Sequence, residues 1–275
     1  MKPYLKIKDH SVSGESFELE FDTSLDMLST RPQPEDLDKY YISEDYISHT
    51  DSNKTVIDKL YQIIKRYSLR KKERLISKYV VGEKTLLDVG AGTGDFLLET
   101  KNRSWVVEGV EPNRGAKDRA NAKGIILHET LQSIKNKKYS IITLWHVLEH
   151  LPNLELQIKD LVSLLNDNGT LVVAVPNFKS YDAGHYKEFW AAYDVPRHLW
   201  HFSKSSIEKL FAAQGMKVVE IKPMVFDSFY VSLLSEKYKS GHTNFVKAFA
   251  VGLWSNLKGW RTKEYSSHIY ILKRA

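Results

Sequence analysis

The chain has 275 residues, of which 42% are hydrophobic and none is cysteine. The missing cysteines exclude disulfides, thiolate zinc sites and thiol nucleophiles, and no apolar run reaches the roughly 20 residues that a membrane span needs. No apolar stretch follows the first lysines as in a secretory signal, so we expect a soluble, cytoplasmic protein. The net charge of +6 permits an anionic partner without naming one.

The first 53 residues predict a small β-rich cap. Residues 4–8 and 16–21 flank a turn-rich segment and alternate apolar with polar side chains, which indicates two short strands. Residues 31–53 contain two prolines and many acidic and aromatic side chains, and they predict an ordered loop or lid. Within it, residues 40–49 could close over a ligand.

Residues 54–80 predict two linking helices, at about 53–67 and 71–79. Apolar residues recur there at helical spacing. We therefore interpret the basic side chains of this segment as a solvated helix face in preference to a binding site for nucleic acid. These side chains are Lys65, Arg66, Arg70, Lys71, Lys72 and Arg74.

From residue 81 onward, short apolar runs alternate with amphipathic stretches, which is typical of βαβ units. The predicted strands are residues 85–89, 105–110, 124–127, 140–144, 170–175, 217–221 and 268–273. Helices are predicted at 153–165, at 202–215 with Ser203 or Ser205 as N-cap, and within an insertion at 225–265. The apolar stretch 248–254 is too short to cross a bilayer, and we favour its burial over contact with a membrane surface.

Three glycines, Gly90, Gly92 and Gly94, follow the apolar run that ends at Asp88 and Val89. A turn of this kind brings bare backbone close to a ligand at the carboxyl edge of a parallel sheet. The third glycine arrives one residue early for a dinucleotide fingerprint, and acidic side chains at 88 and 95 would repel a pyrophosphate. A phosphate-free, cationic nucleoside fits better, although a turn with only a structural role is the simpler alternative.

The segment LLDVGAGTGDF (86–96) resembles the first motif of class I S-adenosylmethionine-dependent methyltransferases, and later motifs follow in order. They are VEGVEPN (107–113), YSIITLWHVLEHLPN (139–153) and LNDNGTLVVAVPN (165–177). HVLEHLPN and PRHLWHFSKSSIEKLFAAQG resemble the small-molecule branch that includes the ubiquinone-biosynthesis O-methyltransferases. The resemblance covers about residues 80–224 and the last strand.

This resemblance implies an α/β fold: a doubly wound, mostly parallel, seven-stranded Rossmann-like sheet in residues 81–275, with the N-terminal cap and the helical insertion added. It implies S-adenosylmethionine as cofactor and S-adenosylhomocysteine as product. Asp88, Gly90, Gly92 and Gly94 would shape the cofactor turn. Glu111 would accept hydrogen bonds from both ribose hydroxyls.

In the same family pattern, Trp145 and His146 would line the cofactor and acceptor pocket, while Glu149 and His150 would brace the loop. Residues 177–203 contain eight aromatic side chains and three histidines and would form an acceptor lid. The candidate catalytic residues are His146, His185, Tyr193 and His198, with Arg197 beside them. A neutral histidine could take the proton of a hydroxyl acceptor, and packing is the alternative role for each candidate.

We therefore expect methyl transfer to a small-molecule acceptor, with O-methylation ahead of N- or C-methylation. The alternatives are a non-catalytic cofactor-binding protein and a nucleic-acid methyltransferase. The second is disfavoured because LWHVLEH replaces the Asn/Asp-Pro-Pro-aromatic signature of enzymes that methylate base amino groups. Residues 146–150 also fit the H-x-x-E-H zinc pattern, but Pro152 leaves little helix to align the histidines, so we expect no metal. The oligomeric state is left open.

Overall fold

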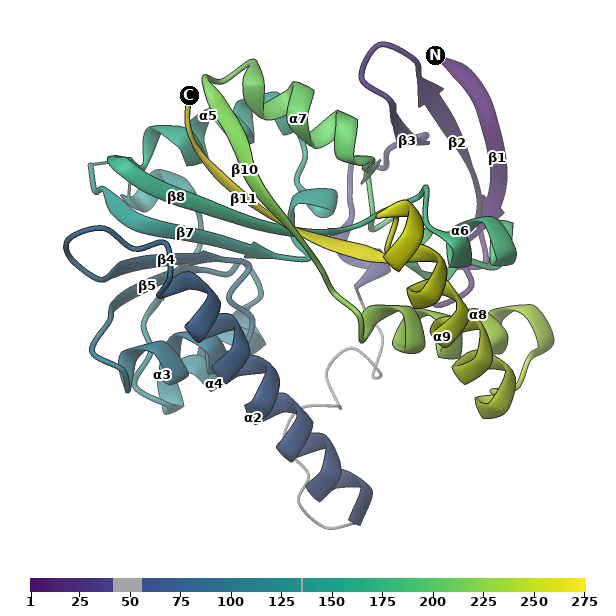
Figure 1. Cartoon of the computed structure of the whole chain (residues 1–275), viewed down its shortest axis with the longest axis horizontal. Coiled ribbons are helices and arrows are strands. Elements are labelled where there is room, and N and C mark those ends of the chain that lie inside the picture. The colour runs from purple at the N-terminus through teal and green to yellow at the C-terminus, as the bar shows by residue number, and fades with distance from the viewer. Residues whose placement is uncertain (42–55, 135) are drawn as a thin grey trace.

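The computed structural model describes residues 1–41, 56–134 and 136–275, with the side chains of 38 and 56–64 outside the description. These residues form two sheets (Figure 1). The strands of the larger, seven-stranded sheet are, in spatial order, β10 (Met216–Pro223), β11 (Ser267–Arg274), β8 (Leu165–Pro176), β7 (Tyr139–Trp145), β4 (Thr85–Val89), β5 (Val106–Val110) and β6 (Leu127–His128).

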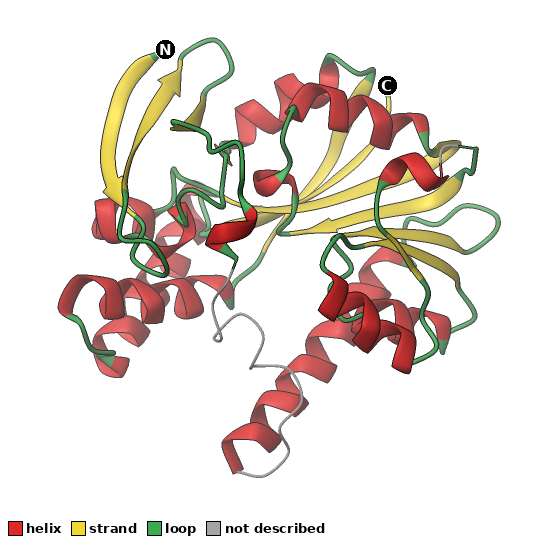
Figure 2. Ribbon diagram, turned by 180° about the vertical axis from the view of Figure 1, so that it is seen from behind, coloured by secondary structure: helices red, strands yellow, loops and turns green. Residues whose placement is uncertain are grey.

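The strands from β8 to β6 are parallel, and β11 lies antiparallel between β8 and β10. Helices cover both faces of this sheet (Figures 1 and 2). One face carries α2 (Val56–Ile76), α3 (Asp95–Lys101) and α4 (Arg114–Ala122), and the other carries α5 (Leu154–Ser163) and α7 (Lys204–Ala212). The predicted doubly wound, mostly parallel, seven-stranded sheet is confirmed.

The central strands are apolar throughout because both faces of the sheet are buried. Side chains of adjacent strand residues point to opposite faces. Ile141 belongs to the buried cluster that includes Leu97 of α3, and Ile142 belongs to the cluster that includes Ile158 of α5. Continuous apolar runs are typical of such strands, and this explains why their positions could be predicted.

The smaller sheet is antiparallel and joins the N-terminus to the predicted acceptor lid. Its strands, in order, are β1 (Lys2–Lys8), β2 (Ser16–Asp22), β3 (Met27–Arg31) and β9 (Trp200–His201). Strand β9 lies within residues 177–203, which also contain α6 (Tyr181–Tyr186). The insertion before the last strand forms α8 (Asp227–Ser240) and α9 (Phe245–Thr262).

One buried cluster connects these peripheral parts, and we call it the cap core. It includes Ile7, Phe17, Leu19 and Leu28 of the N-terminal strands, Tyr186, Trp190 and Tyr193 of the predicted lid, and Val231 and Val251 of α8 and α9. The boundaries 1–53, 54–80 and 81–275 stay a prediction. The cap core nevertheless shows that the N-terminal sheet packs with the lid and the insertion as one body.

Several elements differ from their predictions. The two linking helices are one helix, α2, since residues 67–71 contain no glycine or proline to end it. The third N-terminal strand, β3, was not predicted. The strand predicted at 124–127 is only Leu127–His128, because Ile125 turns into the core beside Gly94. The N-cap of α7 is Ser203, within a capping box. Most of the predicted loop 31–53 lies outside the described residues.

Candidate functional site

The glycine turn between β4 and α3 has the conformation that its sequence suggests. Gly90, Gly92 and Gly94 have φ angles of 71°, 53° and 73°, in the left-handed region that favours glycine. A Cβ atom on Gly90 would lie 2.3 Å from Cγ2 of Val147. A Cβ atom on Gly92 would meet no described atom within 4 Å. The backbone of this turn is therefore open at the carboxyl edge of the sheet.

Two carboxyl groups flank the turn. Asp88 is buried and accepts a 2.5 Å hydrogen bond from Oγ1 of Thr143. Burial raises the pKa of Asp88 to about 7, against the opposing effects of that hydrogen bond and of Lys72. Glu111 follows β5, and its carboxylate accepts hydrogen bonds from the backbone N–H groups of Gly92 and Asn113, both at 2.9 Å. The ends of two neighbouring parallel strands thus place both carboxyl groups at one edge of the sheet, which is where the ligand crevice of open α/β sheets lies.

Lys72 also reaches this crevice, although the helical pattern of its segment predicted that its side chain would face solvent. Its ammonium lies 4.4 Å from the ring centroid of Trp145 and feels the charges of Asp88 and Asp227. Burial lowers the pKa of Lys72. Lys65 turns inward too, with Nζ 2.7 Å from a carboxylate oxygen of Asp95. The solvated-face interpretation is wrong for these two lysines.

His146 lies between two carboxylates at the mouth of the crevice. Its backbone is left-handed, with φ 58°, which is uncommon for a non-glycine residue. Nδ1 lies 3.4 Å from Oε1 of the buried Glu149, and Nε2 lies 3.0 Å from Oδ2 of Asp227. Burial lowers the pKa of His146, but the two carboxylates outweigh it and raise the pKa to about 10. His146 is thus a cation at neutral pH in this arrangement.

His150 and His198 form a second group beside Glu149, with ring centroids 4.5 Å apart. Nδ1 of His150 donates to the carbonyl oxygen of Arg197 at 3.0 Å, and Nδ1 of His198 donates to that of Ala192 at 2.9 Å. A neutral His150 therefore presents the lone pair of Nε2. Burial and the neighbouring His198 lower the pKa of His150 to about 4.

The ligand atoms of Glu149, His150 and His198 all lie within 4.8 Å of one another. These are donor types found in transition-metal sites, so this is where the described residues could hold an ion. The H-x-x-E-H interpretation requires His146 and His150 on one helical face. His146 instead bonds Asp227, and Leu148–His150 is a short 3-10 turn. The absence of a metal stays a prediction.

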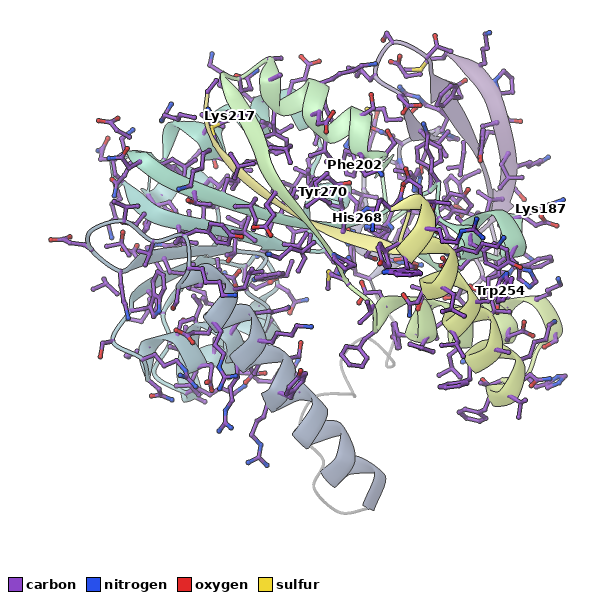
Figure 3. All side chains as sticks on the ribbon, in the orientation of Figure 1. Lys187, Phe202, Lys217, Trp254, His268 and Tyr270 are labelled. Atoms are coloured by element: carbon purple, nitrogen blue, oxygen red, sulfur yellow. The ribbon has the colours of Figure 1, made fainter. Side chains whose placement is uncertain are left out.

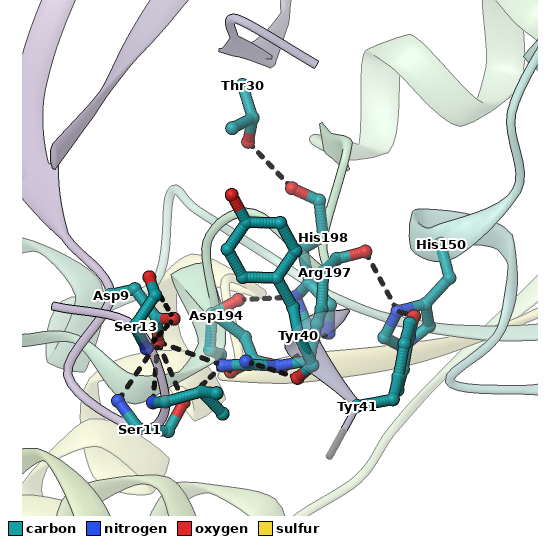
Figure 4. A network of polar contacts seen from close by, with 12 residues as sticks. Asp9, Ser11, Ser13, Thr30, Tyr40, Tyr41, His150, Asp194, Arg197 and His198 are labelled. Atoms are coloured by element: carbon teal, nitrogen blue, oxygen red, sulfur yellow. Dashed lines mark hydrogen bonds and ion pairs between the residues drawn. The ribbon is translucent and has the colours of Figure 1, made fainter. Parts of the chain in front are cut away.

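Arg197 is buried and ties the predicted lid to the N-terminal sheet (Figure 4). Its guanidinium donates to Asp194 at 3.0 Å and to the carbonyl oxygen of Tyr40 at 3.0 Å, and it lies 3.4 Å from Asp9. Burial alone would raise the pKa of Asp9, but hydrogen bonds from Ser13 and other neighbours, together with Arg197, lower it to about 2. This geometry gives Arg197 a role in holding the cap.

Two other predicted catalytic residues lie in packed surroundings. Tyr193 is buried in the cap core, and its ring contacts Trp190 and His201 edge-on. His185 lies on α6, with its ring between those of Tyr181 and Tyr186. Their catalytic assignment stays a prediction. The structure brings His146 to Asp227 and His198 to Glu149, and it surrounds His185 and Tyr193 with other aromatic rings.

Asp227 was also missed by the sequence analysis. It is the first residue of α8, in an insertion far along the chain from β7. Its acidic side chain at a helix start is an ordinary feature, and nothing in the local pattern marks it as a partner of His146. Only the packing of the insertion against the sheet edge reveals the contact.

Comparisons with known proteins agree with this architecture. A ubiquinone biosynthesis O-methyltransferase of Rickettsia canadensis is 25% identical over 170 residues, covering 56% of this chain and 72% of the relative. The magnesium protoporphyrin IX methyltransferase of Synechocystis, solved with bound S-adenosylhomocysteine, has a TM-score of 0.56 at 14% identity, over 87% of this chain and 99% of that one. A geranyl diphosphate C-methyltransferase of Streptomyces coelicolor has a TM-score of 0.56 at 11% identity, over 83% and 88%.

These structural neighbours confirm the predicted class I methyltransferase fold. The family model described as a methyltransferase domain matches residues 54–221, which is more than half of the chain and includes the glycine turn, Glu111 and His146. The chain therefore belongs to the methyltransferase domain family.

Proposed function

We propose that this S-adenosylmethionine-dependent methyltransferase transfers the methyl group to an oxygen atom of a small-molecule acceptor. The observation that carries the proposal is the crevice at the carboxyl edge of β4 and β5, with His146 at its mouth. Relatives that are named ubiquinone biosynthesis O-methyltransferases, at 24–25% identity, favour an oxygen acceptor.

The crevice fits a cationic nucleoside cofactor. Gly92 leaves open backbone, and Glu111 has two carboxylate oxygens that can accept the ribose hydroxyls. Lys72 would pair with the carboxylate at the amino-acid end of the cofactor. The buried indole Nε1–H of Trp145 has no acceptor among the described residues and is free to donate to a ligand. When bound, the cofactor supplies an electrophilic methyl group on a sulfonium.

His146 suits an acceptor that must lose a proton. If an acceptor hydroxyl takes the place of the Asp227 carboxylate at Nε2, the imidazole loses one of the two partners that raise its pKa. As this pKa falls, the imidazolium releases its Nε2 proton to solvent, and the neutral Nε2 can then accept the hydroxyl proton while Nδ1 stays 3.4 Å from the Glu149 carboxylate. Asp227 would thus act as a counter-ion that the acceptor displaces.

The test is incubation with isotope-labelled S-adenosylmethionine and matched phenols, catechols and amines, with mass spectrometry of the products. We expect the hydroxyl compounds to gain one labelled methyl group and His146→Gln to slow the transfer by about 100-fold or more. Methylation of amines or carbon atoms alone would contradict the oxygen assignment. Cofactor binding without any release of S-adenosylhomocysteine would instead favour a non-catalytic protein.

A further inference from the structure

Helix α9 exposes its large apolar side chains and buries its small ones. Its buried residues are Ala248, Val251, Gly252, Ser255 and Gly259. Its exposed apolar residues, which we call the α9 apolar face, are Phe245, Val246, Phe249, Leu253, Trp254, Leu257 and Trp260. The exposed fractions of Phe245, Val246 and Trp260 are 70%, 81% and 69%. A helix that packs only within its own domain shows the reverse distribution.

The close packing of α9 fixes this orientation. A Cβ atom on Gly252 would lie 2.8 Å from the ring of Phe229 on α8, and one on Gly259 would lie 2.8 Å from the ring of Tyr265. The small residues therefore allow a close approach that a rotated helix could not make. The burial predicted for residues 248–254 is wrong for the large side chains Phe249, Leu253 and Trp254.

The charges on α9 itself have one sign, and the acidic Glu264 beyond its end is paired with Lys204 at 2.9 Å. Helix α9 contains two lysines and one arginine but no acidic residue, and Lys263 follows it. The two acidic side chains of α8 point inward: Asp227 bonds His146, and the buried Glu236 lies 3.2 Å from Nζ of Lys247. The exposed surface of the α9 helix is thus apolar with basic side chains, and Figure 3 shows Trp254 on this helix.

We propose that the α9 apolar face docks on an anionic lipid bilayer, with α9 lying in the plane of the interface. Exposed Trp, Phe and Leu side chains insert at the boundary between headgroups and acyl chains, and Lys or Arg side chains contact anionic headgroups. Lys258 supports this arrangement, since its ammonium lies 5.4 Å from the ring centroid of Trp254. In the described part of the chain, no helix is long and apolar enough to cross a membrane.

A second copy of the chain fits this face less well. Two α9 helices packed face to face would bring the basic residues of each close to those of the other. The helix offers no acidic side chain to pair with them. An anionic bilayer supplies both the apolar environment and the opposite charge.

The test is flotation of the full-length protein with vesicles of phosphatidylcholine, alone or with about one-third phosphatidylglycerol. We expect binding to the anionic vesicles to be at least tenfold stronger than to the neutral ones. The double variant Phe249→Ser/Trp254→Ser should lose at least tenfold of this binding, and Lys258→Glu/Arg261→Glu should lose the preference for anionic lipid. All four side chains are exposed, so circular dichroism should show an unchanged fold.

The matched control is Val106→Ser/Ile126→Ser, which removes two exposed apolar side chains from the other end of the molecule. It should bind vesicles like the wild type. Equal binding of the wild type to both vesicle types, or unchanged binding of Phe249→Ser/Trp254→Ser, would overturn the proposal. So would a dimer in lipid-free sedimentation that the same variant dissociates. The assay uses neither cofactor nor acceptor, so its outcome is independent of the proposed methyl transfer.

Discussion

Asp88 combines a function in the crevice with a cost in stability. Burial raises the pKa of Asp88 to about 7 in the folded chain. The folded chain therefore favours the neutral carboxyl group. The free energy of unfolding is unaffected by this group's charge below about pH 4, and it falls as the pH rises from about 4 to about 7. Asp88→Asn removes the buried charge and keeps an oxygen for Thr143. We expect urea denaturation at pH 8 to show the variant on the order of 2 kcal/mol more stable than the wild type, and no difference at pH 4. A less stable variant at pH 8 would contradict the buried-charge explanation.

Glu111 should decide cofactor affinity. Glu111→Ala removes a charged acceptor of two hydrogen bonds, which we expect to weaken S-adenosylmethionine binding by about 2 kcal/mol, or roughly 30-fold. Titration calorimetry measures this change. Glu129→Ala is the control, because Glu129 is exposed and contacts Lys117 at 3.4 Å. Equal affinity in the Glu111 variant would remove Glu111 from the cofactor site.

If His146 is the base, its protonation determines how turnover depends on pH. In the free enzyme the carboxylates raise the pKa of His146 to about 10, so kcat/KM for a hydroxyl acceptor should rise with pH up to that value. Asp227→Asn removes one carboxylate and lowers this pKa. We expect the variant to reach its plateau at a lower pH, as measured by a pH–rate profile. Identical profiles would mean that His146 is not the base.

Among the individual site residues, those that belong to local sequence motifs could be predicted from the sequence. Asp88, the three glycines and Glu111 directly follow strands, and parallel strands bring these positions to one edge. Lys72 and Asp227 reach the same edge from α2 and α8. Their positions depend on how two helices dock, and helical periodicity does not specify that.

Among the elements, the N-terminal segment and the lid are joined by the buried Arg197 as well as by the β3–β9 pairing. Arg197→Met would leave the buried Asp9 and the partly exposed Asp194 without their cation, and loss of one partner of a buried pair costs about 3 kcal/mol or more. We expect urea denaturation to show this loss. Arg103→Met is the control, since Arg103 is more exposed in its pairs with Glu73 and Glu99, and it should cost less than about 1 kcal/mol. Equal losses would contradict the special role of Arg197.

The strands of the large sheet were the elements best predicted, because burial on both faces produces apolar runs that are visible in the sequence. The short strands β3 and β9 carry no such signal. Leu28 pairs with His201, far along the chain, and β9 is defined by that pairing alone. The predicted break in α2 is wrong because residues 68–70 include no glycine or proline that would end a helix, so the two periodic segments join.

For the molecule as a whole, the buried clusters separate the sheet from the cap. Two clusters lie on the two faces of the large sheet, and the cap core joins β1–β3, the lid and α8–α9. The cap could not be predicted as one body, because its parts are distant in sequence. His146 and Asp227 form a contact between the sheet edge and the cap. The cap is therefore placed to respond to what binds in the crevice.

This division predicts how the molecule opens. Segments that share a core exchange amide hydrogens in a cooperative unit, so Arg197→Met should speed exchange in β1–β3, α6 and α8–α9 together. Strands β7 and β8 belong to other clusters and should exchange as slowly as in the wild type. Hydrogen-exchange mass spectrometry resolves these segments, with Arg103→Met as control. Faster exchange in β1–β3 alone would show that the N-terminal sheet detaches by itself. That result would contradict a single cap core, because the lid and the insertion would then keep their packing without it.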